Sequence, residues 1–176
     1  MFKPVYIKFL HWRRFGWLVL ALFALPGPVT VRAASDNADV TATVIAALSL
    51  VNQTALTFGD VAAGNSPGTV ILKPDGTRLT TGGSFINSTV AAGPAVFSVS
   101  GLPNAVYAIT LPNFVVLSGA SGNSMVVDGF SSQPFGNGLT DPGGEQNLFV
   151  GATLNINANQ AVGSYSGKMI VTVIHN

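Results

Sequence analysis

The sequence contains no cysteine, and this absence excludes several classes of chemistry. Disulfides, thiol catalysis, thiolate metal sites and a lipid-attachment cysteine all require a thiol. Small exported domains often depend on disulfides, so this chain has to be held together by its hydrophobic core and its backbone hydrogen bonds. About 143 residues remain after a predicted leader, and a domain of that size buries roughly two-thirds of its surface.

Charged residues are also scarce, at 9% of the chain, and they are unevenly distributed. Five of the eight lysines and arginines lie within residues 1–33. The remainder keeps Lys73, Arg78 and Lys168 against seven acidic residues, which gives a formal net charge of −4. A weakly acidic domain lacks the basic patch that nucleic-acid binding requires. It also lacks the basic amphipathic helix that is typical of membrane-surface binding.

The N-terminal residues have the layout of a secretory signal peptide. The basic residues of this region are Lys3, Lys8, Arg13 and Arg14. Residues 15–25 form an uncharged apolar stretch of about 11 residues, against roughly 20 needed to span a bilayer. Residues 31–33 (Val-Arg-Ala) have the spacing of a cleavage site. We predict a helical signal peptide over residues 1–33, as in bacterial exported proteins, and one domain over residues 34–176. An uncleaved anchor is the alternative.

The rest of the sequence is rich in apolar and polar residues that alternate, and helix signals are nearly absent. Short apolar runs are separated by Gly, Pro, Asn, Asp and Ser, a pattern typical of strands joined by turns. The clearest alternation places Leu148, Val150, Ala152 and Leu154 on one face. These features predict an all-β fold, namely an antiparallel β-sandwich of the immunoglobulin or pilin type with about nine or ten strands.

Local signals predict two strand pairings. Residues 70–72 and 78–80 flank residues 74–76 (Pro-Asp-Gly). In that turn, proline presets φ, aspartate hydrogen-bonds its own backbone and glycine accepts a positive φ. The last two predicted strands, residues 148–156 and 165–174, are long and close in sequence, so we expect them to form an antiparallel pair.

The side chains that could act as nucleophiles, acids, bases or metal ligands match no known active-site motif. A Ser-His-Asp mechanism would have to use His175, the single histidine after the leader, which lies one residue from the end and is expected at an edge or in solvent. Residues 64–68 match the letters G-x-S-x-G, but the oxyanion hole of a nucleophile elbow needs a backbone N–H where this chain has Pro67. Asp141 and Glu145 offer oxygen ligands for calcium, although their spacing fits no known calcium loop. We therefore predict a protein that is not an enzyme, with no catalytic, cofactor-binding or metal-binding residues and no cofactor.

Six short motifs occur in order along residues 40–176. They are LTFGD (56–60), KPDG (73–76), FSVSG (97–101), VGATL (150–154), GSYSG (163–167) and VTV (171–173). In these motifs the chain resembles the bacterial secreted family known as domain of unknown function 4402. The resemblance implies an exported β-sandwich similar to pilin or spore-coat-like subunits, and it implies no catalytic residues.

A candidate interaction segment lies near the start of the predicted domain, at residues 40–50. Its alternating apolar positions are Val40, Ala42, Val44, Ala46, Leu48 and Leu50. A free strand with this pattern can complete a neighbour's open sheet, because backbone hydrogen bonds give affinity and alternate side chains fill pockets. The other interpretation is an ordinary first strand of the chain's own sandwich.

Together these features predict an exported, non-catalytic surface or structural protein, such as a fimbria-like or adhesive subunit. Its expected partners are other copies or pilin-like subunits, bound through residues 40–50, with no nucleic acid and no membrane after the signal is cleaved. The expected location is the periplasm, the cell surface or the extracellular space. The alternative function is an extracellular or periplasmic module that binds a glycan.

Overall fold

The structure is a computed structural model that describes residues 32, 34–44, 46–87 and 90–176. The chain divides into two units, Met1–Thr41 and Ala42–Asn176. Apart from Arg32, the predicted signal peptide lies outside the described residues. Residues 34–41 of the first unit form neither helix nor strand. Among the described residues, no helix combines the length and the apolar character needed to cross a bilayer.

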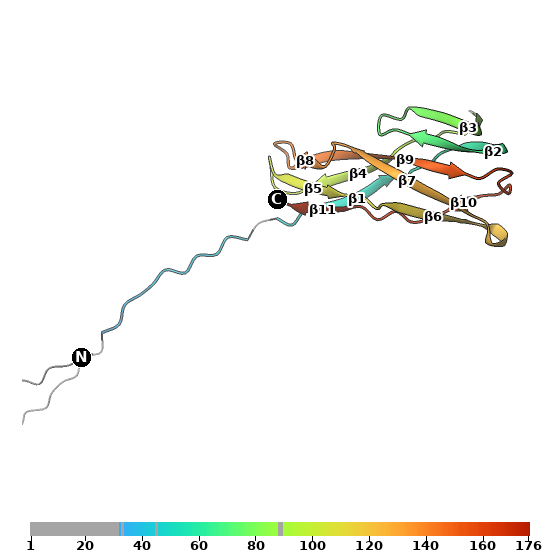
Figure 1. The fold of residues 1–176 in the computed structure, drawn as a ribbon. Coiled ribbons are helices and arrows are strands. Elements are labelled where there is room, and N and C mark those ends of the chain that lie inside the picture. The colour runs from blue at the N-terminus through green and yellow to red at the C-terminus, as the bar shows by residue number, and fades with distance from the viewer. Residues whose placement is uncertain (1–31, 33, 45, 88–89) are drawn as a thin grey trace, which may run out of the picture. The chain divides into compact units, whose positions relative to one another are not determined.

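The second unit is all-β, as the sequence predicts. Its described residues form eleven strands and one short 3-10 helix (Figure 1). The elements are β1 (Ser49–Thr54), β2 (Asp60–Leu72), β3 (Arg78–Asn87), β4 (Ala95–Ser100), β5 (Val106–Thr110), β6 (Phe114–Gly119), η1 (Ala120–Gly122), β7 (Ser124–Gln133), β8 (Asn137–Leu139), β9 (Glu145–Ile156), β10 (Tyr165–Ser166) and β11 (Thr172–His175). Every strand pairing is antiparallel. The predicted antiparallel sandwich is confirmed, with slightly more strands than the sequence indicated.

The strands form two sheets, and β9 is the centre of the larger one. The larger sheet has the order β1-β4-β9-β7-β6-β10, and the hairpin β2–β3 joins it through β2. One edge of β9 pairs with β7, whereas the other edge pairs first with β4 and then with β2. The smaller sheet has the order β11-β5-β8.

The alternation predicted for β9 is confirmed. Leu148 and Val150 are fully buried, and Ala152 and Leu154 are at most 5% exposed. Gly151 lies on β9 between the residue that pairs with the start of β4 and the residue that pairs with the end of β2. A Cβ atom there would lie 2.7 Å from the carbonyl carbon of Lys73. A glycine is therefore needed at this point, because two strands share one edge of β9 and the chain that follows β2 passes close to its backbone.

The two sheets enclose a core between β4 and β9 on one side and β5 and β11 on the other. Its buried residues are Ala95, Phe97, Val99, Tyr107, Leu148 and Val150. Tyr107 is the largest of the fully buried side chains. Its hydroxyl donates a hydrogen bond of 2.6 Å to Gln146 Oε1, which also accepts the Leu139 backbone N–H at 2.9 Å. The phenol is thus buried with its polar atom satisfied, as a core tyrosine needs to be.

The β2–β3 hairpin forms around the predicted turn. Leu72 pairs with Arg78, and Gly76 has a φ of +85°. The Asp75 carboxylate accepts the Thr77 backbone N–H at 2.8 Å, and this hydrogen bond holds the pKa of Asp75 below its usual value. The turn chemistry read from the sequence therefore accounts for the hairpin.

Two expectations about strands are wrong. Residues 40–50 do not form one strand, because β1 begins at Ser49, and residues 40–44 and 46–48 lie outside every strand. The last two predicted strands do not pair with each other either. Both edges of β9 are already occupied by β7, β4 and β2, so β10 pairs with β6 and β11 pairs with β5.

We expect Leu148→Ala to lower the free energy of unfolding by about 2–5 kcal/mol, because it leaves a cavity in the closed part of the core. The control is Val116→Ala, at a β6 position that is 48% exposed, where the loss should stay below about 1 kcal/mol. Urea unfolding followed by circular dichroism measures both. Equal losses would show that β9 is not the buried centre of the sheet.

Tyr107 should make the fold sensitive to alkali. Burial raises the pKa of the Tyr107 phenol, so the native state favours the neutral form. The stabilisation is complete below the usual tyrosine pKa of about 10 and is lost as the pH rises through the higher value of the folded state. We expect Tyr107→Phe to cost about 1 kcal/mol at neutral pH and to reduce the fall in urea midpoint above about pH 10. An identical alkaline fall in both proteins would contradict this.

Candidate functional site

The smaller sheet covers one half of β9, and two segments of chain outside that sheet cover the other half. The smaller sheet covers the part of β9 that carries Leu148 and Val150. The part that carries Ala152, Leu154 and Ile156 belongs to a second apolar cluster, whose other buried members are Phe58, Val70, Leu72 and Val127. Its strand residues all come from the larger sheet, and Phe58 comes from the segment between β1 and β2. No strand of the smaller sheet contributes a buried residue to this second cluster.

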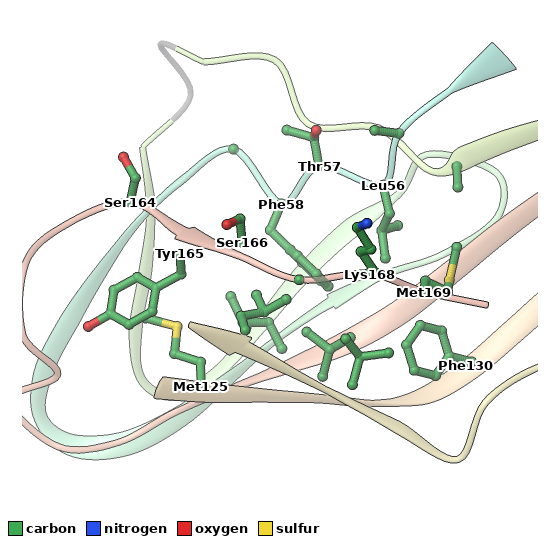
Figure 2. Close-up of a pocket in the computed structure, with 18 of the residues that line it drawn as sticks. Leu56, Thr57, Phe58, Met125, Phe130, Ser164, Tyr165, Ser166, Lys168 and Met169 are labelled. Carbon is green, nitrogen blue, oxygen red and sulfur yellow. The ribbon is translucent and has the colours of Figure 1, made fainter. Parts of the chain in front are cut away.

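Two segments of chain lie over this second cluster and leave a cavity of about 880 Å³ between them. We call this cavity, together with the two segments that border it, the groove, and we call each of these segments a rim. Its first rim is residues 55–61 and its second rim is residues 163–170. Apolar side chains dominate the lining, among them Leu56, Phe58, Val115, Leu117, Met125 and Phe130. Figure 2 shows Phe58 and Met125 extending into this space from opposite sides.

The first rim is held by a few specific contacts. Thr57 forms an isolated bridge with Gly93, with backbone hydrogen bonds of 3.0 and 2.9 Å. The Arg78 guanidinium donates a hydrogen bond of 2.6 Å to the Phe58 carbonyl. Gly59 has a φ of +71°, and a Cβ atom there would lie 2.6 Å from Arg78 Nη1. The glycine of the LTFGD motif therefore lets the chain turn beside the arginine and place Phe58 over the sheet.

The second rim contains β10 and part of the segment that connects the larger sheet to the smaller one. Tyr165 and Ser166 pair with Gly119 and Ser118 of β6, and the chain joins the smaller sheet only at Thr172. Residues 167–171 between these points belong to no ladder. The rim is fixed at its start by the Tyr165 hydroxyl, which donates to the Ala161 carbonyl at 2.7 Å and accepts from Gln160 Nε2 at 3.0 Å.

The chemistry of the groove suits an apolar occupant. Its charged lining residues are Asp60 and Lys168, and its one aromatic hydroxyl is that of Tyr165. Lining residues include no histidine and no second carboxylate that could share a proton with Asp60. The arrangement can bind apolar side chains and offer backbone groups.

The structure keeps the candidate residues of the sequence apart. His175 is exposed on β11, and Ser66 lies in the irregular part of β2 with no helix after it. Asp141 Oδ1 accepts the backbone N–H groups of Gly143 and Glu145 at 2.8 and 2.9 Å, so this carboxylate stabilises the loop before β9. Among the residues that the structure describes, no three His, Cys, Asp or Glu side chains form a group that could hold a metal ion.

Sequence reasoning did not find the groove. The signals were present in part, since LTFGD and GSYSG were singled out and they supply parts of its two rims. The two rims are about 100 positions apart in the sequence, and the larger sheet brings them together. A local sequence pattern does not predict that two such distant segments lie close in space.

Comparison with known proteins gives one match. The sequence model of the family described as "Domain of unknown function (DUF4402)" matches residues 48–175. No curated protein and no solved structure matches the chain. Because the match spans more than half of the chain, the protein belongs to this family.

We expect Arg78→Met to loosen the first rim, because it removes the hydrogen bond to the Phe58 carbonyl. A hydrogen bond from a charged group contributes about 1.5–3 kcal/mol. Amide hydrogen exchange should become at least fivefold faster at Thr57, while the amides of β9 keep their protection. Lys73→Met, which removes an exposed cation from the same hairpin, is the control. Equal exchange at Thr57 in both variants would contradict the role of Arg78.

Proposed function

We propose that this member of the DUF4402 family is an exported, non-catalytic β-sandwich subunit that assembles with other copies of itself into a surface structure. One observation carries the proposal. Residues 40–47 have the alternating apolar pattern of a strand, yet they lie outside every described strand, and Val40 and Val44 are 93% and 95% exposed.

This exposure is unusual for such a pattern. A strand with alternating apolar residues normally buries one face. Apolar side chains that stay in water contribute no hydrophobic stabilisation, because their surface is not buried. Val40 and Val44 together therefore expose apolar surface that a partner could bury. Strand addition to another copy buries that surface and also satisfies the backbone groups of the segment.

The other features agree with an exported structural subunit. The basic and apolar regions of residues 1–33 have the order expected of a secretory leader. Asp141 has a structural role in its loop, and the groove is lined mainly by apolar side chains. An apolar lining of this kind suits the apolar side chains of a donated strand better than it suits a polar glycan.

Charge placed on the apolar face of the segment tests this proposal. We expect the purified protein to form multimers and Val40→Asp/Val44→Asp to be monomeric, because two carboxylates cannot be buried unpaired. The measurement is size-exclusion chromatography with light scattering. Thr41→Asp/Thr43→Asp is the matched control, because it adds the same charge to the opposite face and should still assemble. A monomeric wild-type protein, or equal assembly of all three proteins, would contradict the proposal.

A further inference from the structure

We infer that the groove between residues 55–61 and 163–170 is the acceptor for residues 40–47 of a second copy of this chain; Leu48, which follows them, packs against the chain's own core. The inference rests on the proposed function and adds the missing half of the contact. It assigns a donor segment and an acceptor site to the same molecule, so that copies join head to tail. A heterologous contact of this kind extends into a filament unless its rotation closes a ring.

The second layer of the sandwich is incomplete over the second half of β9. The smaller sheet ends before the second apolar cluster, and the segments that lie over that cluster leave about 880 Å³ unfilled. Leu117 and Met125 line this space and are half-buried, whereas the neighbouring Val127 is 2% exposed. An added strand over this position would extend the second layer of the sandwich along the rest of β9.

The second rim has a stretch of backbone that pairs with no strand. Residues 167–171 belong to no ladder, although they connect two paired strands. Gly167 lies against β6, since a Cβ atom there would lie 2.8 Å from the Val116 carbonyl oxygen. Unpaired N–H and C=O groups at a sheet edge are a template for pairing with another strand. The second rim thus offers backbone partners beside an apolar floor, which are the two components of strand addition.

The donor segment and the groove match in length. Strands rise about 3.3 Å per residue, so the eight residues of the second rim and the eight residues 40–47 each extend about 26 Å. A smaller adjoining cavity of about 310 Å³ shares Val61, Met125, Gly163 and Tyr165 with the groove and lengthens it. Val40, Ala42, Val44 and Ala46 are small or β-branched, and such side chains fit between the larger groups of the floor.

The donor segment comes from another copy because it leads into the end of β1 that is far from the chain's own groove. Ser49 pairs with Ser100 at one end of β4, whereas the groove is lined by Ala95 and Phe97 near the other end. The six residues of β4 separate these ends by about 20 Å. Residues 42–48 precede Ser49 in the same unit, so the chain enters β1 at the end of that strand away from the groove. These residues would have to reverse direction and run back along β1, and most of their length would be used before they reached the groove.

The absence of cysteine makes a direct test possible. We expect a chain carrying Val44→Cys to form a disulfide with a separate chain carrying Ser166→Cys or Met125→Cys when the two are mixed under mild oxidation. Ser166 is exposed on the rim and differs from cysteine by one atom, so this variant should fold even if Met125→Cys does not. The linked heterodimer is identified by mass, with one chain isotope-labelled.

Two controls define the geometry. Phe85→Cys places an acceptor thiol on β3, where the side chain is 64% exposed and outside the groove. Thr43→Cys moves the donor thiol to the opposite face of the segment. We expect Val44→Cys with Ser166→Cys to give at least tenfold more heterodimer than Val44→Cys with Phe85→Cys. Thr43→Cys should link to Met125→Cys less well than Val44→Cys does.

The outcomes separate the inference from the proposed function. If the wild-type protein assembles, Val40→Asp/Val44→Asp does not, and the groove thiols link no better than Phe85→Cys, the donor segment binds elsewhere and the acceptor assignment is overturned while the proposed function stands. If the wild-type protein stays monomeric at every concentration, both are overturned. Preferential linkage at Ser166→Cys or Met125→Cys establishes the acceptor.

Discussion

The fold depends on one strand with three neighbours. β9 pairs with β7 along one edge and with β4 and then β2 along the other, so both of its edges are satisfied by strands of the same sheet. Its buried face, from Leu148 to Ile156, is longer than the second sheet that covers it. Because β10 and β11 pair with different sheets, the last strand cannot close the remaining space. The groove follows from that mismatch.

The sequence predicts well what depends on neighbouring residues. The period-two pattern of β9 and the turn at residues 74–76 are local properties, and both are confirmed. Residues 148–156 and 165–174 were expected to pair, and they do not, because strand partners depend on which edges are already filled. The alternation at residues 40–48 predicts a strand equally well, but an apolar pattern does not say whether the partner sheet lies in the same molecule.

The candidate site was missed for the same physical reason. Its two rims carry the LTFGD and GSYSG motifs, yet the order of strands in the larger sheet is what brings these motifs close together. The residues that sequence reasoning examined for chemistry, including His175 and Asp141, lie outside the groove. A site built from apolar side chains and unpaired backbone has no characteristic residue type, so a search for nucleophiles or metal ligands does not find it.

Over the second half of β9, the larger sheet is covered by two segments of chain that leave a groove accessible to solvent. The most direct measurement is methyl NMR of the monomeric Val40→Asp/Val44→Asp protein with a soluble paramagnetic agent. The account predicts strong broadening of the Leu117 and Met125 methyl signals and almost none for Leu148 and Val150. Equal protection of all four would show that the chain closes its own sandwich and that no groove exists.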